Sequence, residues 1–422
     1  MATRLSPATR AVEIWHDGTK LPANAGEPLA FALIAADRIA LARSPKLHRP
    51  RGPYCLAGAC DGCLARVDGV PNVMTCMRRA AGGEQIETQN VFGSRETDLL
   101  RASDFLFPKG IDHHQLFAGV PIISDVVQAF ARRVAGLGEL PDEAQLPREA
   151  RKLSVDVAVV GGGRSGLTLA EALRRANVGD VHLFDDKLEL GANLRLLWPE
   201  RAEGAVLAAQ SAAVVCHPET TIVGLFESPG GAPPTLLATN AEGATLVSAR
   251  AIVLATGSSD RTLLFGNNDL PGVFSARAAL ALLRAHISIG PRVLLVDAAE
   301  MGRVFEQLAT DQLQITHATS DSLLSAKGSA RVSGARFRDT KQTWRGEAIV
   351  IDGPRPSALQ LAIQAGFAVE FSGEAYRLRS PASSAAALPP VWVTGHAAEC
   401  GGTQAAHTHT LTLAISHFLG KA

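Results

Sequence analysis

The 422-residue sequence predicts an α/β protein that carries a small α+β domain at its N-terminus. The α/β part is indicated by an apolar, β-branched run at 155–160 that leads into three consecutive glycines and then a stretch with helical periodicity. The α+β part is indicated by alternating residues at 11–15 and by four cysteines between positions 55 and 76. Because hydrophobic residues make up 46% of the chain, two or three domains can each bury a core.

Charge and hydropathy argue against several classes of partner. The formal net charge is zero, and a nucleic-acid or anionic-membrane partner would need a basic surface. The first residues form no apolar run typical of a signal peptide, and no later segment reaches membrane-spanning length without Gly, Pro or charge. We therefore expect a cytoplasmic protein without a transmembrane segment.

Residues 1–95 are expected to form a ferredoxin-like β-grasp domain. A strand at 11–15 is followed by the turn residues Asp17 and Gly18 and by a second strand. Apolar residues at helical spacing predict a helix over 29–41, and a further strand at 64–67 follows the cysteine loop. This order of hairpin, helix, cysteine loop and strand is typical of that fold.

The cysteines of this domain have the spacing C-x4-C-x2-C-x12-C and are Cys55, Cys60, Cys63 and Cys76. Three closely spaced thiolates and a later fourth are the ligand pattern of plant-type [2Fe–2S] domains. Gly58 and Gly62 are expected to take positive φ and to turn backbone N–H groups toward the sulfurs. A zinc site is the alternative, but zinc usually takes paired C-x2-C knuckles, and only one such pair is present. The spacing therefore predicts a [2Fe–2S] cluster.

Residues 96–150 are predicted to be a helical connector and linker. An apolar helical stretch at 121–137 is followed by polar, proline-marked residues. The adjacent residues His113 and His114 could act as ligands or as a proton relay. Neighbouring side chains point apart, so a capping or packing role is favoured.

Residues 151–422 are expected to form a Rossmann-type domain with a dinucleotide site. The strand at 155–160, the G-x-G-x-x-G loop, a helix at 167–176 and a strand at 181–184 that ends in an acidic residue together make the dinucleotide-binding fingerprint. Its first glycine makes the turn, its second lets the pyrophosphate approach, and its third lets the helix pack on the strand. The pyrophosphate would lie at the helix N-terminus, and the acidic residue would accept hydrogen bonds from the ribose. The candidate residues are Gly161, Gly163, Arg164, Ser165, Gly166 and Asp185.

Two later segments indicate that this dinucleotide is FAD. Thr256 and Gly257 follow a strand at 251–255, and Gly395 and His396 follow a late strand. Both segments are similar to those that surround the flavin in flavoproteins with two dinucleotide-binding domains. His396 stands where these proteins usually have an acidic residue, so its contact with the flavin is an open question. The nearby Cys400 is a candidate neighbour of the cofactor, and Arg261 is a candidate phosphate contact.

A second, degenerate fingerprint lies within a shortened NAD-type subdomain at about 270–350. The strand at 291–296 and Gly302 are kept, but Asp297 and Ala299 replace the first two glycines. The methyl group of Ala299 would obstruct a pyrophosphate, and the carboxylates of Asp297 and Glu300 would repel it. We therefore expect that the NAD(P) site has been lost.

Two further stretches resemble a known family. Residues 43–52 resemble the R-S-x-K-x-H-R-P-R-G stretch of the α subunit of heterotetrameric sarcosine oxidase, and residues 267–274 resemble its N-D-x-P-G-V turn. Similar subunits occur in opine oxidases, hydrogen cyanide synthase and dye-linked proline dehydrogenases. This chain departs from the sarcosine oxidase pattern in having the complete cysteine tetrad.

The resemblance implies an FAD-dependent oxidoreductase subunit that relays electrons. A partner, an amino-acid-oxidase-like flavoprotein β subunit, would oxidise an amine or amino acid of the sarcosine, opine or proline type. This chain would pass the electrons through FAD and the [2Fe–2S] cluster to a downstream acceptor. One alternative is a self-sufficient NAD(P)H-dependent flavin reductase that feeds a ferredoxin-type acceptor, and another is a structural subunit with vestigial cofactors. The sequence assigns no catalytic residue and names neither the substrate nor the terminal acceptor.

Overall fold

The computed structural model describes residues 1–44, 49–89, 91, 148–227, 234–338, 340–373, 375–379, 391–398 and 404–420. The predictions made for His113, His114 and Cys400 lie outside these residues, as does nearly all of the predicted connector. Contacts divide the chain into two compact units, each assembled from two segments. Unit 1 contains Met1–Gln145 and Asp260–Pro354, and unit 2 contains Leu146–Ser259 and Arg355–Ala422. The predicted NAD-type subdomain is therefore grouped with the cysteine-containing segment.

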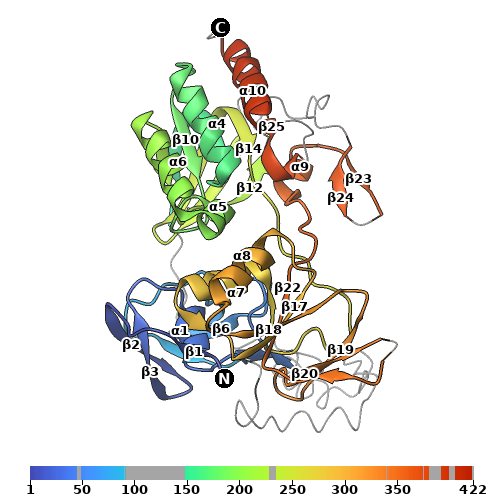
Figure 1. Ribbon diagram of the computed structural model, residues 1–422. Coiled ribbons are helices and arrows are strands. Elements are labelled where there is room, and N and C mark those ends of the chain that lie inside the picture. The colour runs from blue at the N-terminus through green and yellow to red at the C-terminus, as the bar shows by residue number, and fades with distance from the viewer. Residues whose placement is uncertain are drawn as a thin grey trace, which may run out of the picture. The chain divides into compact units, whose positions relative to one another are not determined.

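The N-terminal part of unit 1 is a five-stranded sheet in the order β3-β2-β8-β6-β7, packed against one helix (Figure 1). Its first hairpin turns through Asp17 and Gly18, whose φ values of 48° and 74° suit the right-handed twist of the two strands. Strands β2 and β8 are parallel, which gives the β-grasp topology that the sequence predicts. The elements are β2 (Ala11–His16), β3 (Thr19–Asn24), α1 (Leu29–Ala35), β6 (Leu64–Val67), β7 (Val70–Met74) and β8 (Gln85–Glu87).

Helix α1 ends at Ala35, six residues before the predicted end of the helix. Asp37 takes a left-handed φ of 59°, which an α-helix cannot accommodate. The Asp37 carboxylate also accepts hydrogen bonds from the Ala2 N–H and from Arg331, each at 2.8 Å. Contacts with distant residues thus end a helix that apolar spacing alone would extend.

The second part of unit 1 is a small nucleotide-binding fold. A four-stranded parallel sheet has the order β15-β22-β17-β18, and helices α7 and α8 lie side by side against it (Figure 1). A three-stranded antiparallel sheet, β19-β20-β21, packs on the same core. The elements are β15 (Val273–Ser275), α7 (Ala276–Arg284), β17 (Arg292–Val296), α8 (Glu300–Ala309), β18 (Gln314–Ala318), β19 (Leu323–Lys327), β20 (Gly334–Phe337), β21 (Thr343–Trp344) and β22 (Ala348–Ile351).

The two parts of unit 1 are joined at the two stretches that carry the family resemblance. Arg49 donates to Asp269 Oδ1 at 2.8 Å and to Asn267 Oδ1 at 2.9 Å, and Arg51 donates to Asp269 Oδ2 at 3.1 Å. We call Arg49, Arg51 and Asp269 the arginine latch. A short antiparallel pair, β1 (Thr3–Arg4) with β16 (Ile287–Ser288), adds a second connection.

We predict that Asp269→Ala lowers the free energy of unfolding of unit 1 by about 1–3 kcal/mol, because it removes charge-assisted hydrogen bonds to two arginines. The measurement is denaturant unfolding of the cluster-containing protein, followed by loss of visible absorbance. Glu242→Ala is the matched control. The Arg151–Glu242 pair is more than half exposed on both sides, so its loss should cost less than about 0.5 kcal/mol. Equal effects of the two variants would contradict a joining role for the latch.

Unit 2 is built on a seven-stranded sheet in which β10, β9, β14 and β25 are parallel. The long strand β14 also pairs with the antiparallel hairpin β12-β13. The elements are β9 (Arg151–Val160), α4 (Arg164–Arg175), β10 (Val181–Phe184), α5 (Ala192–Leu197), α6 (Pro199–Ser211), β11 (Val215–His217), β12 (Thr221–Phe226), β13 (Thr235–Asn240), β14 (Gly243–Leu254), α9 (Gln360–Gln364), β23 (Val369–Phe371), β24 (Tyr376–Leu378), β25 (Val391–Val393) and α10 (Gln404–Phe418).

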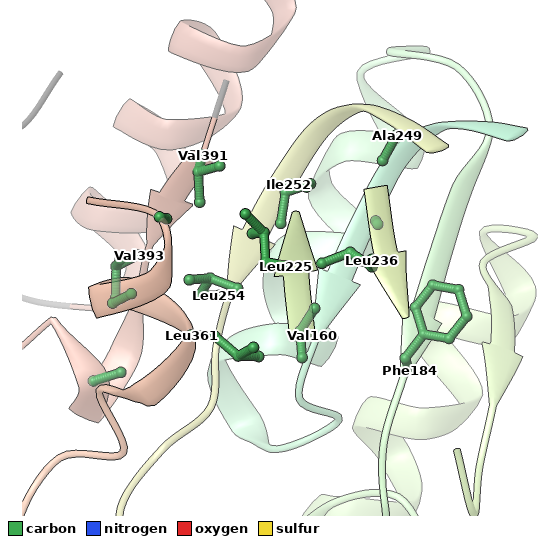
Figure 2. Close-up of a cluster of buried hydrophobic side chains, with 14 of the residues drawn as sticks. Val160, Phe184, Leu225, Leu236, Ala249, Ile252, Leu254, Leu361, Val391 and Val393 are labelled. Atoms are coloured by element: carbon green, nitrogen blue, oxygen red, sulfur yellow. The ribbon is translucent and has the colours of Figure 1, made fainter. Parts of the chain in front are cut away.

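Both faces of this sheet are buried, as its apolar strands require. Helices α4, α6 and α10 cover one face. On the other face, strand residues such as Val160, Ile252 and Leu254 pack against Leu225 of β12 and Leu361 of α9 (Figure 2). Burial on both sides fixes the strand ends, and therefore the loops that follow them. Within the described part of the chain, no helix has the length and apolarity needed to cross a membrane.

Candidate cofactor sites

The four predicted ligand cysteines lie together in two pairs. The Sγ atoms of Cys55 and Cys60 are 3.3 Å apart, and the Cys63 and Cys76 side chains are hydrogen-bonded to each other. Among the described residues, no three or more Cys, His, Asp or Glu side chains are placed to hold one metal ion. Cys55 with Cys60, and Cys63 with Cys76, would supply two thiolates to each of two irons. The paired donors therefore fit a two-iron cluster better than a single zinc ion.

Two glycines shape the cysteine loop for different reasons. Gly58 has a φ of 72°, as predicted, and a Cβ there would lie 3.0 Å from the sulfur of Met77. Gly62 is not in the left-handed region, which corrects the prediction for this residue. A Cβ on Gly62 would lie 2.1 Å from the carbonyl oxygen of Gly52, so close packing of the loop explains this glycine.

Hydrogen bonds favour one thiolate in each pair. A hydrogen bond from the Cys55 thiol lowers the pKa of Cys60 to about 6. The backbone N–H groups of Cys55 and Gly62 contribute to this lowering. A hydrogen bond with Cys63 lowers the pKa of Cys76 in the same way, and the N–H of Gly58 adds to this effect. The loop thus stabilises negative charge on sulfur, which is the form that binds iron.

The first glycine loop joins β9 to α4 and requires two of its glycines for packing. Gly161 has a φ of 112°, and a Cβ there would lie 2.2 Å from the carbonyl oxygen of Ala255. A Cβ on Gly166 would lie 1.9 Å from the carbonyl oxygen of Gly161. At Gly163 the backbone is extended, and a Cβ would meet only the Ala192 methyl group at 3.8 Å. Gly163 therefore leaves open space at the N-terminus of α4.

Asp185, at the end of β10, lies directly beside this loop. Its carboxylate accepts hydrogen bonds from the N–H of Gly162 at 2.6 Å and from the N–H of Lys187 at 2.8 Å. Burial raises the pKa of Asp185, and these two N–H donors oppose the rise. The sequence predicts a contact with ribose, and the structure adds that the same carboxylate holds the loop in place. Each oxygen retains a lone pair for a ribose hydroxyl.

The late segment lies against the start of α4. Gly395 has a φ of 69°, and a Cβ there would lie 2.5 Å from Ser165 Oγ, so two predicted site residues are in contact. His396 is exposed, and its Nε2 lies 3.0 Å from the carbonyl oxygen of Arg355. Arg164 is also exposed at the N-terminus of α4, where its charge suits a phosphate.

Thr256 and Gly257 form the turn after β14. The Thr256 hydroxyl donates to the carbonyl of Ala358 at 2.7 Å, and the Ala358 N–H donates to the carbonyl of Gly257 at 3.0 Å. This pair of bonds ties the turn to the segment that follows the small nucleotide fold in the chain. Arg261, the candidate phosphate contact, belongs to unit 1.

Tyr54, which immediately precedes the first ligand cysteine, also contributes to this site. Its hydroxyl donates to the carbonyl of Arg261 at 2.7 Å, and its own carbonyl accepts the N–H of Ser275 at 2.9 Å. Burial, together with the Asp260 carboxylate, raises the pKa of Tyr54. Tyr54 thus fixes the cysteine loop to the nucleotide fold of unit 1. No local pattern marks it, because its partners lie more than two hundred residues away.

Comparison with known proteins agrees with this geometry. A family model described as "2Fe-2S iron-sulfur cluster binding domain" matches residues 9–91. The sarcosine oxidase subunit alpha of Rhizobium meliloti (strain 1021) is 27% identical over an alignment of 296 residues, which covers 64% of this chain and 30% of that protein. The corresponding subunit of Corynebacterium sp. (strain P-1) is 25% identical over 67% of this chain and 28% of that protein. The chain is thus similar to sarcosine oxidase α subunits over about two thirds of its length and has a separate match to a [2Fe–2S] domain.

These similarities agree with the resemblance drawn from residues 43–52 and 267–274. The chain spans less than a third of the length of these α subunits. Among solved structures, L-proline dehydrogenase from P. horikoshii matches 99% of this chain and 75% of that chain, with a TM-score of 0.75 and 20% identity. That match confirms the predicted fold class, a flavoprotein fold with two dinucleotide-binding domains and an N-terminal ferredoxin-like domain.

Proposed function

We propose that this chain is the electron-transfer subunit of a hetero-oligomeric amine or amino-acid dehydrogenase or oxidase. The observation that carries the proposal is the presence, in one chain, of two cysteine pairs arranged for a two-iron cluster and a complete dinucleotide loop at α4. The relatives support the substrate class, because sarcosine and proline both contain a CH–NH bond. Within that class we propose a sarcosine-, opine- or proline-type substrate.

The residues of each site have separate roles. Cys55 and Cys60 would hold one iron, and Cys63 and Cys76 the other. Gly163 leaves room for a pyrophosphate at the positive end of α4, where the first backbone N–H groups of a helix can bind it. Flavin would supply two-electron chemistry, and the cluster would accept single electrons. Together they would let electrons that arrive as a pair leave the protein one at a time.

The remaining site residues would position the rest of FAD. The Asp185 carboxylate would accept hydrogen bonds from the ribose hydroxyls, while Arg164 neutralises phosphate charge. Ser165 and Gly395 would border the phosphates, and Thr256 and Gly257 the flavin side. His396 can donate a hydrogen bond to a phosphate or flavin oxygen if it leaves its present partner, the carbonyl of Arg355.

Electrons would enter from a partner subunit. We propose an amino-acid-oxidase-like flavoprotein as that β subunit, because the resemblance to sarcosine oxidase α subunits implies such a partner. We also propose a cytoplasmic location, where the ligand cysteines stay reduced. The electrons would leave through the cluster to a downstream acceptor.

The geometry of the second glycine loop supports the entry of electrons from a partner subunit rather than from NAD(P)H. Asp297 occupies the first glycine position with a φ of 54°, and its carboxylate accepts the N–H of Ser320 at 2.9 Å. Ala299 occupies the position that corresponds to Gly163, so its methyl group is placed where a pyrophosphate would approach. We propose that this loop no longer binds NAD(P).

We predict that NADH and NADPH do not reduce the bound flavin, and that neither binds at millimolar concentration by calorimetry. Each carboxylate near a diphosphate should cost on the order of 1 kcal/mol or more, even in a well-solvated loop. The flavin should bleach when the partner subunit and its amine substrate are both present. The measurement is anaerobic absorbance of the flavin after mixing. Rapid bleaching by NADH alone would instead support the self-sufficient reductase.

A further inference from the structure

The two nucleotide folds of this chain can be compared position by position. In unit 2, strand β14 lies beside β9, and the residue after it, Ala255, donates its N–H to the carbonyl of Val160 at 2.8 Å. In unit 1, strand β22 lies beside β17, and the residue after it, Asp352, donates its N–H to the carbonyl of Val296 at 3.0 Å. Asp352 therefore stands where the first fold has alanine.

The Asp352 side chain reaches the N-terminus of helix α8. Its Oδ2 atom accepts the N–H of Gly302 at 2.6 Å, and the residue is only 5% exposed. Gly302 is the third residue of α8, so its N–H has no partner within the helix. An internal carboxylate has thus taken a donor from the helix end to which a nucleotide fold would bind a diphosphate.

The same contact explains why Gly302 is kept when the other two glycines are not. A Cβ on Gly302 would lie 3.0 Å from Asp352 Oδ2 and 3.2 Å from Asp352 Cβ. In the first fold, by contrast, a Cβ on Gly166 would collide with the carbonyl of Gly161. Glycine is therefore needed at position 302 so that the Asp352 carboxylate can approach the backbone of α8. It is not needed there for a tight turn of the loop.

We propose that Asp352 is the specificity-determining residue that closes the second nucleotide fold to dinucleotides. The inference rests on the proposed loss of the NAD(P) site and adds to the obstruction by Ala299 a buried charge at the helix end. Two unit charges 4 Å apart near a protein surface repel by an amount equivalent to about a thousandfold in affinity. A buried carboxylate beside the N-terminus of α8 would thus exclude a diphosphate and limit electron entry to the partner subunit.

The test uses inorganic pyrophosphate, because it needs only the loop and the helix end and not the rest of a dinucleotide pocket. Thermal unfolding and calorimetry would be measured on the full chain saturated with FAD, and again in a Gly163→Val background in which the first loop is blocked. The wild type should show no response to about 10 mM pyrophosphate. The variant Asp352→Ala introduces the alanine that the first fold has at this position. Its Tm should rise with pyrophosphate, and it should bind pyrophosphate at least about tenfold more tightly than the wild type.

Two further variants keep the result interpretable. Asp352→Asn keeps an oxygen that can accept the Gly302 N–H but removes the charge, so it should also gain binding if Asp352→Ala folds poorly. The reciprocal variant Ala255→Asp places a carboxylate beside α4 and should weaken FAD binding at least about tenfold.

The outcomes separate this inference from the proposed function. If the wild type, Asp352→Ala and Asp352→Asn proteins all fold and none of them binds pyrophosphate, the proposed role of Asp352 is wrong. The proposed loss of the NAD(P) site would still stand. A wild-type response that persists with Gly163→Val and disappears with Ala299→Val would show that the second loop is open. That result would overturn the proposed loss itself.

Discussion

Replacing Cys60 with Ser should abolish the visible absorbance of the cluster. Anaerobically purified wild-type protein should contain about two iron atoms and two acid-labile sulfides per chain, as one [2Fe–2S] cluster requires. Cys60 lies 3.3 Å from Cys55, and hydrogen bonds lower its pKa, so it supplies one of the sulfurs most readily available as thiolate. A serine hydroxyl is a harder donor that stays protonated, and it would leave one iron without a ligand. Iron and sulfide analysis, with absorbance spectra, would measure the effect.

Cys216→Ser is the matched control for this experiment. Cys216 lies in the short strand β11 of unit 2, half-buried and packed against the sheet core. Its pKa is raised by burial, in contrast to that of Cys60. Iron content should therefore be unchanged. Equal iron in both variants would refute the ligand assignment, and one zinc per wild-type chain would establish the zinc alternative.

Gly163→Val should yield protein that is free of flavin but still holds iron. Gly163 has φ −77° and ψ −174°, which a valine can adopt, and a Cβ there would have no neighbour closer than 3.8 Å. The side chain thus disturbs little of the protein itself and instead fills the space required by the pyrophosphate. Flavin content after denaturation, compared with iron content, gives the measurement.

Gly204→Val controls for the effect of adding a branched side chain. Gly204 is exposed on α6, and a Cβ there meets nothing within 4 Å. This variant should retain both flavin and iron, apart from the small helix cost of valine. Full FAD in the Gly163→Val protein would mean that the flavin is bound elsewhere, for example at a subunit interface.

Local patterns allowed a correct prediction of the elements around each loop. The strand at 181–184 and the turn at Asp17 and Gly18 depend on neighbouring residues, and the structure contains them as predicted. The early end of α1 could not be read in this way, because it depends on an ion pair between Asp37 and Arg331. Asp185 shows the same limit, since its spacing predicts a ligand contact but not its two hydrogen bonds within the protein.

The contact between residues 43–52 and residues 267–274 could not be predicted from the sequence. Residues 43–52 and 267–274 are recognisable separately, yet nothing in either stretch shows that they bind each other. In the structure Arg49 and Arg51 share the Asp269 carboxylate, and a Cβ on Gly52 would lie 2.9 Å from Pro271. Such a pairing follows from the tertiary fold, which places two loops of opposite charge together.

The arginine latch also has a consequence for how the protein is made on the ribosome. Arg49 and Asp269 are 220 residues apart, and most of the sheet of unit 2 is encoded between them. At about 5–20 residues per second, translation needs about 10–40 s to produce Asp269 after Arg49 has been added. For most of that interval the cysteine loop has been synthesised, but its partners Arg261 and Ser275 have not. In a nascent chain the cysteine loop is thus complete before the nucleotide fold that holds it in the finished protein.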